Sequence, residues 1–194
     1  MINFIHFLTG SQLYGMTNPQ SDYDYLVINN SDNPYPHPEN KEVEVWSRDL
    51  FMVKLVDHDL KALEVYFSNQ VFIRMHYDLI HKLNKSNLRR SVSAVCSNAH
   101  VKAKKKIRDG EIYIGLKSYW HTIRILTMYT DLAKFGTFNP KGYKEQLNPI
   151  YEDIMSMVDD PEPDTIFKRL VEKYDPLARE VIHEFRLLCP LEGN

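Results

Sequence analysis

The sequence predicts an α+β protein, in which a small mixed β-sheet with flanking helices is followed by an all-α helical domain. Short apolar runs separated by Gly, Asn and Pro residues fill the beginning of the chain, as β-strands do. Longer segments with apolar residues three and four positions apart fill the rest, as amphipathic helices do. The polar stretch Asn84–Asn87 separates the two patterns, so we expect one domain over residues 1–86 and a second over residues 87–194.

Each expected element has a local reason in the sequence. Strands are expected over residues 2–8 and 23–28, which are mainly apolar, and over residues 42–46, where charged and bulky side chains alternate. A short helix is expected over residues 11–15, and helical spacing begins at Arg48. In the second domain, stop and cap signals such as Gly110 and Pro176 divide the chain into helices expected over residues 88–107, 111–135, 143–158, 165–174 and 176–188.

The composition excludes several classes of protein. With 24 basic and 26 acidic side chains, the chain is not a polycation that binds nucleic acid through its overall charge. No stretch approaches the ~20 apolar residues needed to span a bilayer, and the first residues lack the basic end of a signal peptide. We therefore expect a cytoplasmic protein with no membrane partner. Cys96 and Cys189 are too few for a disulfide framework or a zinc site.

The most specific feature is a Gly-Ser turn followed by two aspartates at the start of an apolar strand. Asp22 and Asp24 would project from the same side of that strand, about 7 Å apart, where they repel each other unless a cation lies between them. Mg²⁺ favours a few carboxylates together with water and substrate phosphates. Gly10 lets the backbone approach a ligand closely, and Ser11 offers a hydroxyl and an N–H to phosphate oxygens. These residues predict a metal-dependent phosphoryl-transfer site.

This pattern resembles a known family. Gly10-Ser11 followed by Asp22-Tyr23-Asp24 looks like the signature of the DNA polymerase beta-type nucleotidyltransferase superfamily. A longer string is similar to the narrower branch of predicted nucleotidyltransferases typified by the YcgL proteins, and its members here are Gly10, Ser11, Tyr14, Gly15, Ser21, Asp22 and Asp24. The resemblance implies a small nucleotidyltransferase sheet and an enzyme that uses Mg²⁺, with Mn²⁺ as the alternative, to transfer a nucleoside monophosphate from an NTP to a hydroxyl.

The resemblance also implies a third carboxylate on the strand expected over residues 42–46. Glu44 and Glu42 are the candidates, and we favour Glu44 because it lies deeper within the alternating run; two solvent-exposed glutamates are the alternative. In a two-metal scheme Asp22 and Asp24 would hold both ions, and Glu44 would help to hold the first and could accept the proton of the acceptor.

Other residues of the motif would bind the nucleotide. Ser11 would bind a β- or γ-phosphate oxygen, and the resemblance places Gly10 and Ser21 in the same nucleotide-binding motif. Tyr14 would stack on a base or, as tyrosines in turns often do, pack against its neighbours.

Positive charge is expected from the helical domain. Lys117, His121 and Arg124 share one helix face through spacings of four and three, and this segment is similar to the Lys-x-x-x-His-x-x-Arg helix of the YcgL-like branch. They would bind triphosphate or an acceptor phosphate, or else form an amphipathic edge. Lys102 and Lys105 also share a helix side and would bind a nucleic acid, or else form a solvated face.

The expected acceptor is an RNA end, as the resemblance suggests. The alternatives are a protein hydroxyl, in an AMPylating enzyme of antitoxin type, and a small antibiotic. A different class is a nucleotide- or protein-binding module that keeps the fold and does little chemistry. Loss of an acid would mark that state, whereas Asp22, Asp24, Glu42 and Glu44 are all present.

Overall fold

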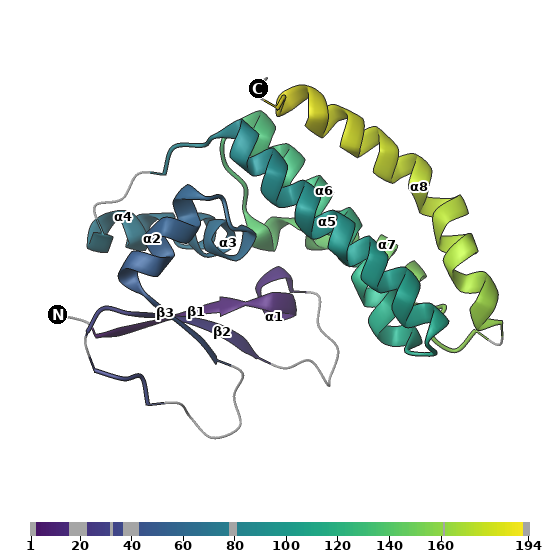
Figure 1. Cartoon of the computed structure of the whole chain (residues 1–194), viewed down its shortest axis with the longest axis horizontal. Coiled ribbons are helices and arrows are strands. Elements are labelled where there is room, and N and C mark those ends of the chain that lie inside the picture. Colours follow the sequence, from purple (N-terminus) through teal and green to yellow (C-terminus); the bar gives the residue numbers. More distant parts are fainter. Residues whose placement is uncertain are drawn as a thin grey trace. The chain divides into compact units, whose positions relative to one another are not determined.

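The computed structural model describes residues 3–15, 23–31, 33–36, 43–77, 81–160 and 162–191. The protein is α+β, as predicted, and its chain divides into two compact units (Figure 1). The first unit comprises residues 1–83 and 139–144, and the second comprises residues 84–138 and 145–194. No helix in the described part of the chain is both long enough and apolar enough to cross a membrane.

A three-stranded mixed sheet forms the base of the first unit. Its order is β1-β2-β3, with β2 antiparallel to β1 and parallel to β3, and its strands are β1 (Phe4–Thr9), β2 (Asp24–Asn29) and β3 (Val43–Ser47). Each strand lies within two residues of its predicted range. The register places Thr9 opposite Asp24 and Leu26 beside Glu44.

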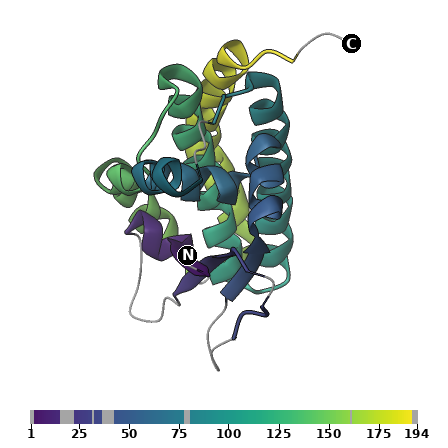
Figure 2. The same cartoon turned by 90° about the vertical axis from the view of Figure 1, so that its left-hand side faces the viewer.

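One face of the sheet carries the core of the first unit. Side chains alternate between faces along a strand, so Phe7, Leu26 and Trp46 point to the same face, and each of them is buried. Figures 1 and 2 show α2, α3 and α4 together on one face of the sheet. The helical segments of this unit are α1 (Gly10–Tyr14), α2 (Arg48–Val56), α3 (Leu60–Ser68), α4 (Gln70–Tyr77) and a 3₁₀ turn η1 (Pro140–Tyr143).

Two of these helices begin at side-chain caps. The Ser47 hydroxyl accepts a hydrogen bond from the Leu50 N–H at the start of α2. The Asp59 carboxylate accepts hydrogen bonds from the N–H groups of Lys61 (3.0 Å) and Ala62 (3.2 Å) at the start of α3. Such caps satisfy N–H groups that have no partner within the helix, so the position of the first turn of α3 is fixed by its own sequence.

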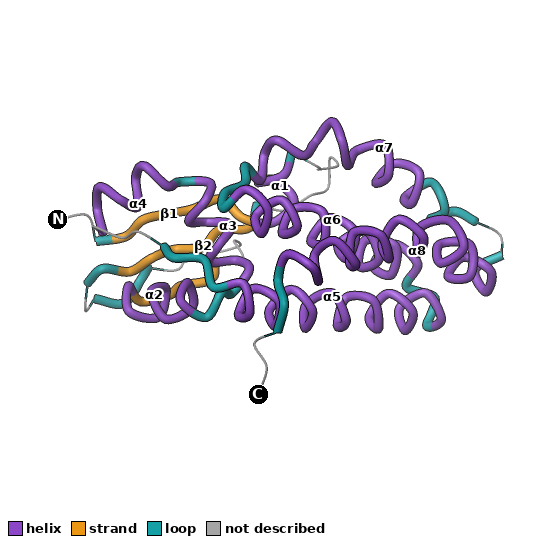
Figure 3. The backbone as a smooth tube through the Cα atoms, turned by 90° about the horizontal axis from the view of Figure 1, so that it is seen from above, coloured by secondary structure: helices purple, strands orange, loops and turns teal. Residues whose placement is uncertain are grey.

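The second unit consists, in its described residues, of helices and their connections. They are α5 (Lys85–Arg108), α6 (Ile112–Phe135), α7 (Lys144–Met155), whose first residue belongs to the first unit, and α8 (Pro163–Leu188). Figure 3 shows α5, α6 and α8 running alongside one another. Gly115 permits a close approach of α6 to α5, because a Cβ there would lie 2.9 Å from the Ile107 backbone nitrogen and 3.0 Å from the Ala103 oxygen.

One helix prediction was wrong in detail, and one short stretch groups with a different unit than expected. The sequence predicted a break between residues 174 and 176, but α8 runs through Pro176 without interruption. Proline removes one backbone hydrogen bond, and the burial of Leu170 on one side of it and Phe185 on the other offsets that cost. The sequence also assigned residues 139–144 to the helical domain, whereas η1 packs on α1 and α3 of the first unit.

Candidate active site

A pocket of about 610 Å³ opens at one end of the sheet in the first unit. It lies where β1 ends, where β2 and β3 begin, and beside the first turn of α3. Its described lining consists of Thr9, Gly10, Asp24, Tyr25, Val43, Glu44 and Lys61. Three residues predicted for one site, Gly10, Asp24 and Glu44, thus line one pocket.

The sheet register places both carboxylates on one face. Residues beside each other on neighbouring strands point to the same face, so Glu44 shares the face of Leu26. Asp24 is two residues before Leu26 on β2 and therefore points to that face as well. Two acidic side chains from neighbouring strands therefore project on the same side of the sheet at the pocket.

The backbone at Gly10 lies directly against the carboxylate of Asp24. Its φ is +66°, in the left-handed region that favours glycine, and a Cβ at this position would lie 2.0 Å from Oδ2 of Asp24. No side chain larger than hydrogen fits there without moving the carboxylate. The turn after β1 and the first residue of β2 therefore form one local structure.

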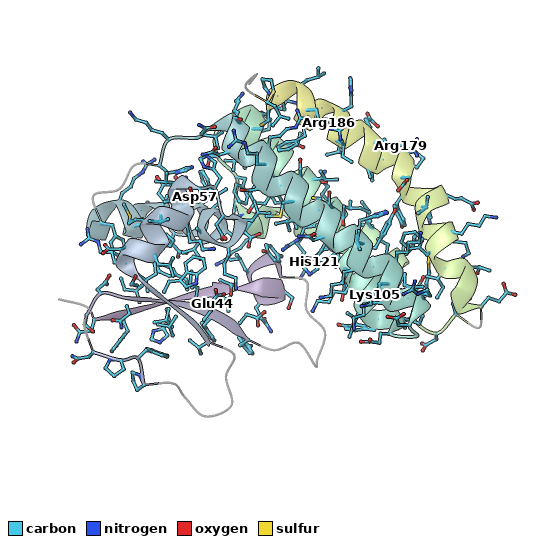
Figure 4. All side chains as sticks on the ribbon, in the orientation of Figure 1. Glu44, Asp57, Lys105, His121, Arg179 and Arg186 are labelled. Atoms are coloured by element: carbon cyan, nitrogen blue, oxygen red, sulfur yellow. The ribbon has the colours of Figure 1, made fainter. Side chains whose placement is uncertain are left out.

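Glu44 is held by two donors on different oxygens. The indole N–H of Trp46 donates to Oε1 at 2.7 Å, and the Lys61 ammonium donates to Oε2 at 2.5 Å. Partial burial raises the pKa of Glu44, but the hydrogen bonds from Lys61 and Trp46 and the charges of Lys61 and Lys54 outweigh that effect and leave the pKa below its usual value. Figure 4 labels Glu44 on its strand.

Lys61 is a pocket residue that the sequence analysis did not identify. Its side chain comes from α3, 17 positions after Glu44 in the chain, and no motif joins the two. The available signal was the cap: Asp59 followed by an apolar periodic segment predicts a helix start, and it places Lys61 in the first turn. That signal fixes the helix and does not indicate which strand the lysine faces.

The remaining motif residues of the first unit differ in placement. Ser11 is half-buried in α1 and is not part of the described pocket lining. Tyr14 is only 2% exposed, which suits packing better than stacking on a base. Asp22, Ser21 and Glu42 lie outside the described residues. Within the described ranges, no group of three or more His, Cys, Asp or Glu side chains is placed to hold a metal ion.

The motif of the second unit lies on α6. Arg124 is 5% exposed, and its guanidinium lies 5.5 Å from the centre of the Trp120 ring. Burial lowers the pKa of His121 well below its usual value, and the charges of Arg124, Lys117 and Lys102 lower it further. This shift disfavours the charged form of His121, so the histidine is a poor source of the positive charge expected of it. Lys102 is close enough to affect the same histidine.

Lys102 and Lys105 are exposed on α5. Their spacing of three places them on one side of the helix, and Figure 4 labels Lys105 and His121 on the two helices. Both lysines are thus available to a polyanion, as they would also be on a solvated face.

The second unit has a pocket of a different character. Its volume is about 400 Å³, it is lined by side chains of α5, α6 and α8, and the surface that they expose to it is mostly apolar. Burial raises the pKa of the Cys96 thiol, at its wall, to about 12, although the Arg124 charge opposes this. That thiol is therefore not a nucleophile at neutral pH.

Comparisons with known proteins give no further guide. No family model matches the chain, and neither the curated proteins nor the solved structures that were searched include a match.

Proposed function

We propose that the protein is a Mg²⁺-dependent nucleotidyltransferase that transfers a nucleoside monophosphate from an NTP to a hydroxyl, with an RNA end as the acceptor. The observation that carries this proposal is the pocket of the first unit, in which Gly10, Asp24 and Glu44 meet. The three come from separate segments of the chain, and the sheet register brings them together at one open end of the sheet, where they can act on the same ligand. The resemblance of the Gly-Ser and Asp-Tyr-Asp segments to nucleotidyltransferases supports the same chemistry.

The donor set fits a hard divalent cation. Asp24 and Glu44 are carboxylates on one face of the sheet, and oxygen ligands of this kind suit Mg²⁺ or Mn²⁺. These two residues would hold the ion, and the resemblance adds Asp22. When bound, a divalent cation neutralises phosphate charge and polarises the phosphoryl group.

The chain's own residues would position the substrates. Gly10 would allow phosphate oxygens close to the backbone beside Asp24. Glu44, which is ionised and already held in place by Trp46, is assigned to the metal. The acceptor oxygen would attack the α-phosphorus, its proton would pass to water, and the bond to pyrophosphate would break. This reaction depends on positioning and charge neutralisation and needs no covalent enzyme intermediate.

A labelling experiment tests the proposal. The purified chain is incubated with each α-labelled NTP and Mg²⁺ or Mn²⁺, with and without bulk RNA. Label on RNA is the expected result, and Asp24→Asn should lower the rate at least about a hundredfold, because the metal loses a ligand worth several kcal/mol. Asp49→Asn, which removes an exposed carboxylate from α2 of the same unit, is the matched control and should stay active.

The other outcomes separate the alternatives. Label on the protein fraction would indicate a protein acceptor. Full activity of Asp24→Asn, or no transferred label in any condition, would exclude the proposed reaction. With RNA as the acceptor, Lys102→Ala or Lys105→Ala should reduce the salt dependence of RNA binding by about one unit of slope for each lost phosphate contact. Lys168→Ala, an exposed lysine of α8, is the control for this measurement.

A further inference from the structure

Lys61 is the only cationic side chain among the described residues that line the pocket of the first unit. Its ammonium lies 2.5 Å from Oε2 of Glu44, which is the carboxylate assigned to the metal under the proposed function. A lysine and a divalent cation cannot both occupy the same position against one carboxylate oxygen. A metal ion that binds at this position on Oε2 must therefore displace the ammonium.

The structure permits that movement. The Lys61 side chain is 40% exposed, and four carbon atoms join its ammonium to the backbone. The backbone itself is fixed by the Asp59 cap at the start of α3. The ammonium can therefore leave Glu44 by rotation about side-chain bonds while the helix stays in place.

The two oxygens of Glu44 have different partners. Trp46 comes from the same strand, and its indole N–H holds Oε1 at 2.7 Å, whereas Lys61 reaches Oε2 from α3. When Lys61 leaves, the bond from Trp46 still orients the carboxylate, and the oxygen that becomes free is Oε2. Trp46 thus orients the carboxylate of Glu44, whereas Lys61 neutralises its charge.

We propose that Lys61 competes with the divalent cation for Glu44 and, once displaced, binds a phosphate oxygen of the nucleotide. The inference rests on the proposed function and adds a nucleotide-binding residue to it. A triphosphate is a polyanion, and an ammonium group released beside the two carboxylates lies in the same pocket as the charge that it would neutralise. Lys61 thus neutralises Glu44 in the empty pocket and the substrate in the loaded one.

The two halves of this proposal predict opposite effects of one substitution. Lys61→Met keeps the length of the side chain and removes its charge. Binding of Mn²⁺ alone, measured by calorimetry, should become about tenfold tighter because the competing cation is gone. Binding of α,β-methylene ATP at saturating Mg²⁺ should become about tenfold weaker because a phosphate partner is gone. A residue with only a structural role would move both affinities in the same direction.

Lys54 provides a matched control. Its side chain is also 40% exposed and belongs to the same unit, but it pairs with Asp59 at 3.3 Å and is not among the described residues that line the pocket. Its charge acts on Glu44 more weakly than the charge of Lys61 does. Lys54→Met should change both affinities much less than Lys61→Met. Lys61→Arg keeps the charge, so both of its affinities should stay close to those of the wild type. This variant shows whether the effect of Lys61→Met comes from the lost charge or from a disturbed fold.

Trp46 provides an optical readout that does not depend on activity. Because its indole donates to Glu44, Mn²⁺ at the carboxylate should change its fluorescence, and Trp46→Phe should remove that change.

The outcomes distinguish this inference from the function on which it rests. If the wild type binds Mn²⁺ and nucleotide and Lys61→Met alters neither affinity, or shifts both in the same direction, the inference is wrong and the proposed function stands. If the wild type binds both and the two shifts are opposite but no nucleotide is transferred, the inference holds and the transferase activity is wrong. If the wild type binds neither, both are overturned.

Discussion

The two units place their motif residues in different environments. In the first unit Asp24 and Glu44 come from the beginnings of adjacent strands and line an open pocket. In the second unit Arg124 is buried on α6, a helix with fifteen buried residues, and burial lowers the pKa of its neighbour His121. Polar residues at regular spacing therefore line an open pocket in the first unit and lie within the packed part of a helix in the second.

The difference follows from the elements that carry the residues. At the beginning of a strand the side chains leave the packed part of the sheet, so a carboxylate can be oriented by neighbours and still be open to a ligand. In the middle of a long helix that packs on several others, a polar side chain must share its environment with the core. We expect substitutions in the first unit to affect chemistry and substitutions along α6 to affect stability.

The largest expected effect is a loss of stability on α6, which tests whether this helix acts mainly in packing. Trp120 is 1% exposed, and its ring meets that of Tyr151 edge to face at 5.0 Å. Trp120→Ala should lower the free energy of unfolding by about 3–5 kcal/mol, because it leaves a large cavity. Chemical denaturation measures this. Phe135→Ala, near the end of the same helix and 65% exposed, should cost no more than about 0.5 kcal/mol.

The next effect concerns chemistry in the first unit. Glu44→Gln should lower the rate of nucleotide transfer about a hundredfold, close to 3 kcal/mol of transition-state stabilisation, because the metal loses a charged ligand. Its stability should change by no more than about 1 kcal/mol, since the ion pair with Lys61 is largely exposed. Glu42→Gln should change the rate only slightly. The reverse ranking would assign the third carboxylate to Glu42.

A glycine comparison isolates the contact at the turn after β1. Gly10 and Gly136 both have positive φ, of +66° and +71°, so alanine strains the backbone at either position. Only at Gly10 does the added Cβ meet another residue, 2.0 Å from Asp24 Oδ2, whereas nothing lies within 4 Å at Gly136. Gly10→Ala should therefore cost about 1–2 kcal/mol more than Gly136→Ala in denaturation, and it alone should impair metal binding. Equal costs would contradict the close fit around Asp24.

The smallest effect is a pH dependence in the first unit. Burial lowers the pKa of His81 to about 4, with help from the charge of His58, whose ring lies 4.8 Å away. His81 binds its proton near pH 6.5 in the unfolded chain and near pH 4 in the folded chain. The contribution of His81 to the free energy of unfolding should therefore fall as the pH falls through this window and change no further below it.

Because solvent reaches His81, we expect a loss of only about 1 kcal/mol. His58, whose pKa is also lowered by burial, should add a loss of the same sign. His81→Phe should flatten the profile of stability between pH 6.5 and 4.

Local patterns determined much of the fold. The strands, the long helices α5 and α6 and the helix start after Ser47 follow from apolar periodicity and capping, which act over a few residues. The candidate residues Gly10, Asp24 and Glu44 could likewise be named from the sequence, because the Gly-Ser turn and the alternating strand are short-range features.

The tertiary structure alone decided which of these residues meet. The strand register brings Asp24 and Glu44 to one face, and the packing of α3 on the sheet brings Lys61 to Glu44 from 17 residues away. Packing also keeps α8 helical through Pro176 and joins residues 139–144 to the first unit. The physical reason is that each of these outcomes depends on the burial of surface between segments far apart in the chain. That burial has no local signature, since the same lysine in the same helix turn would face water if α3 packed differently.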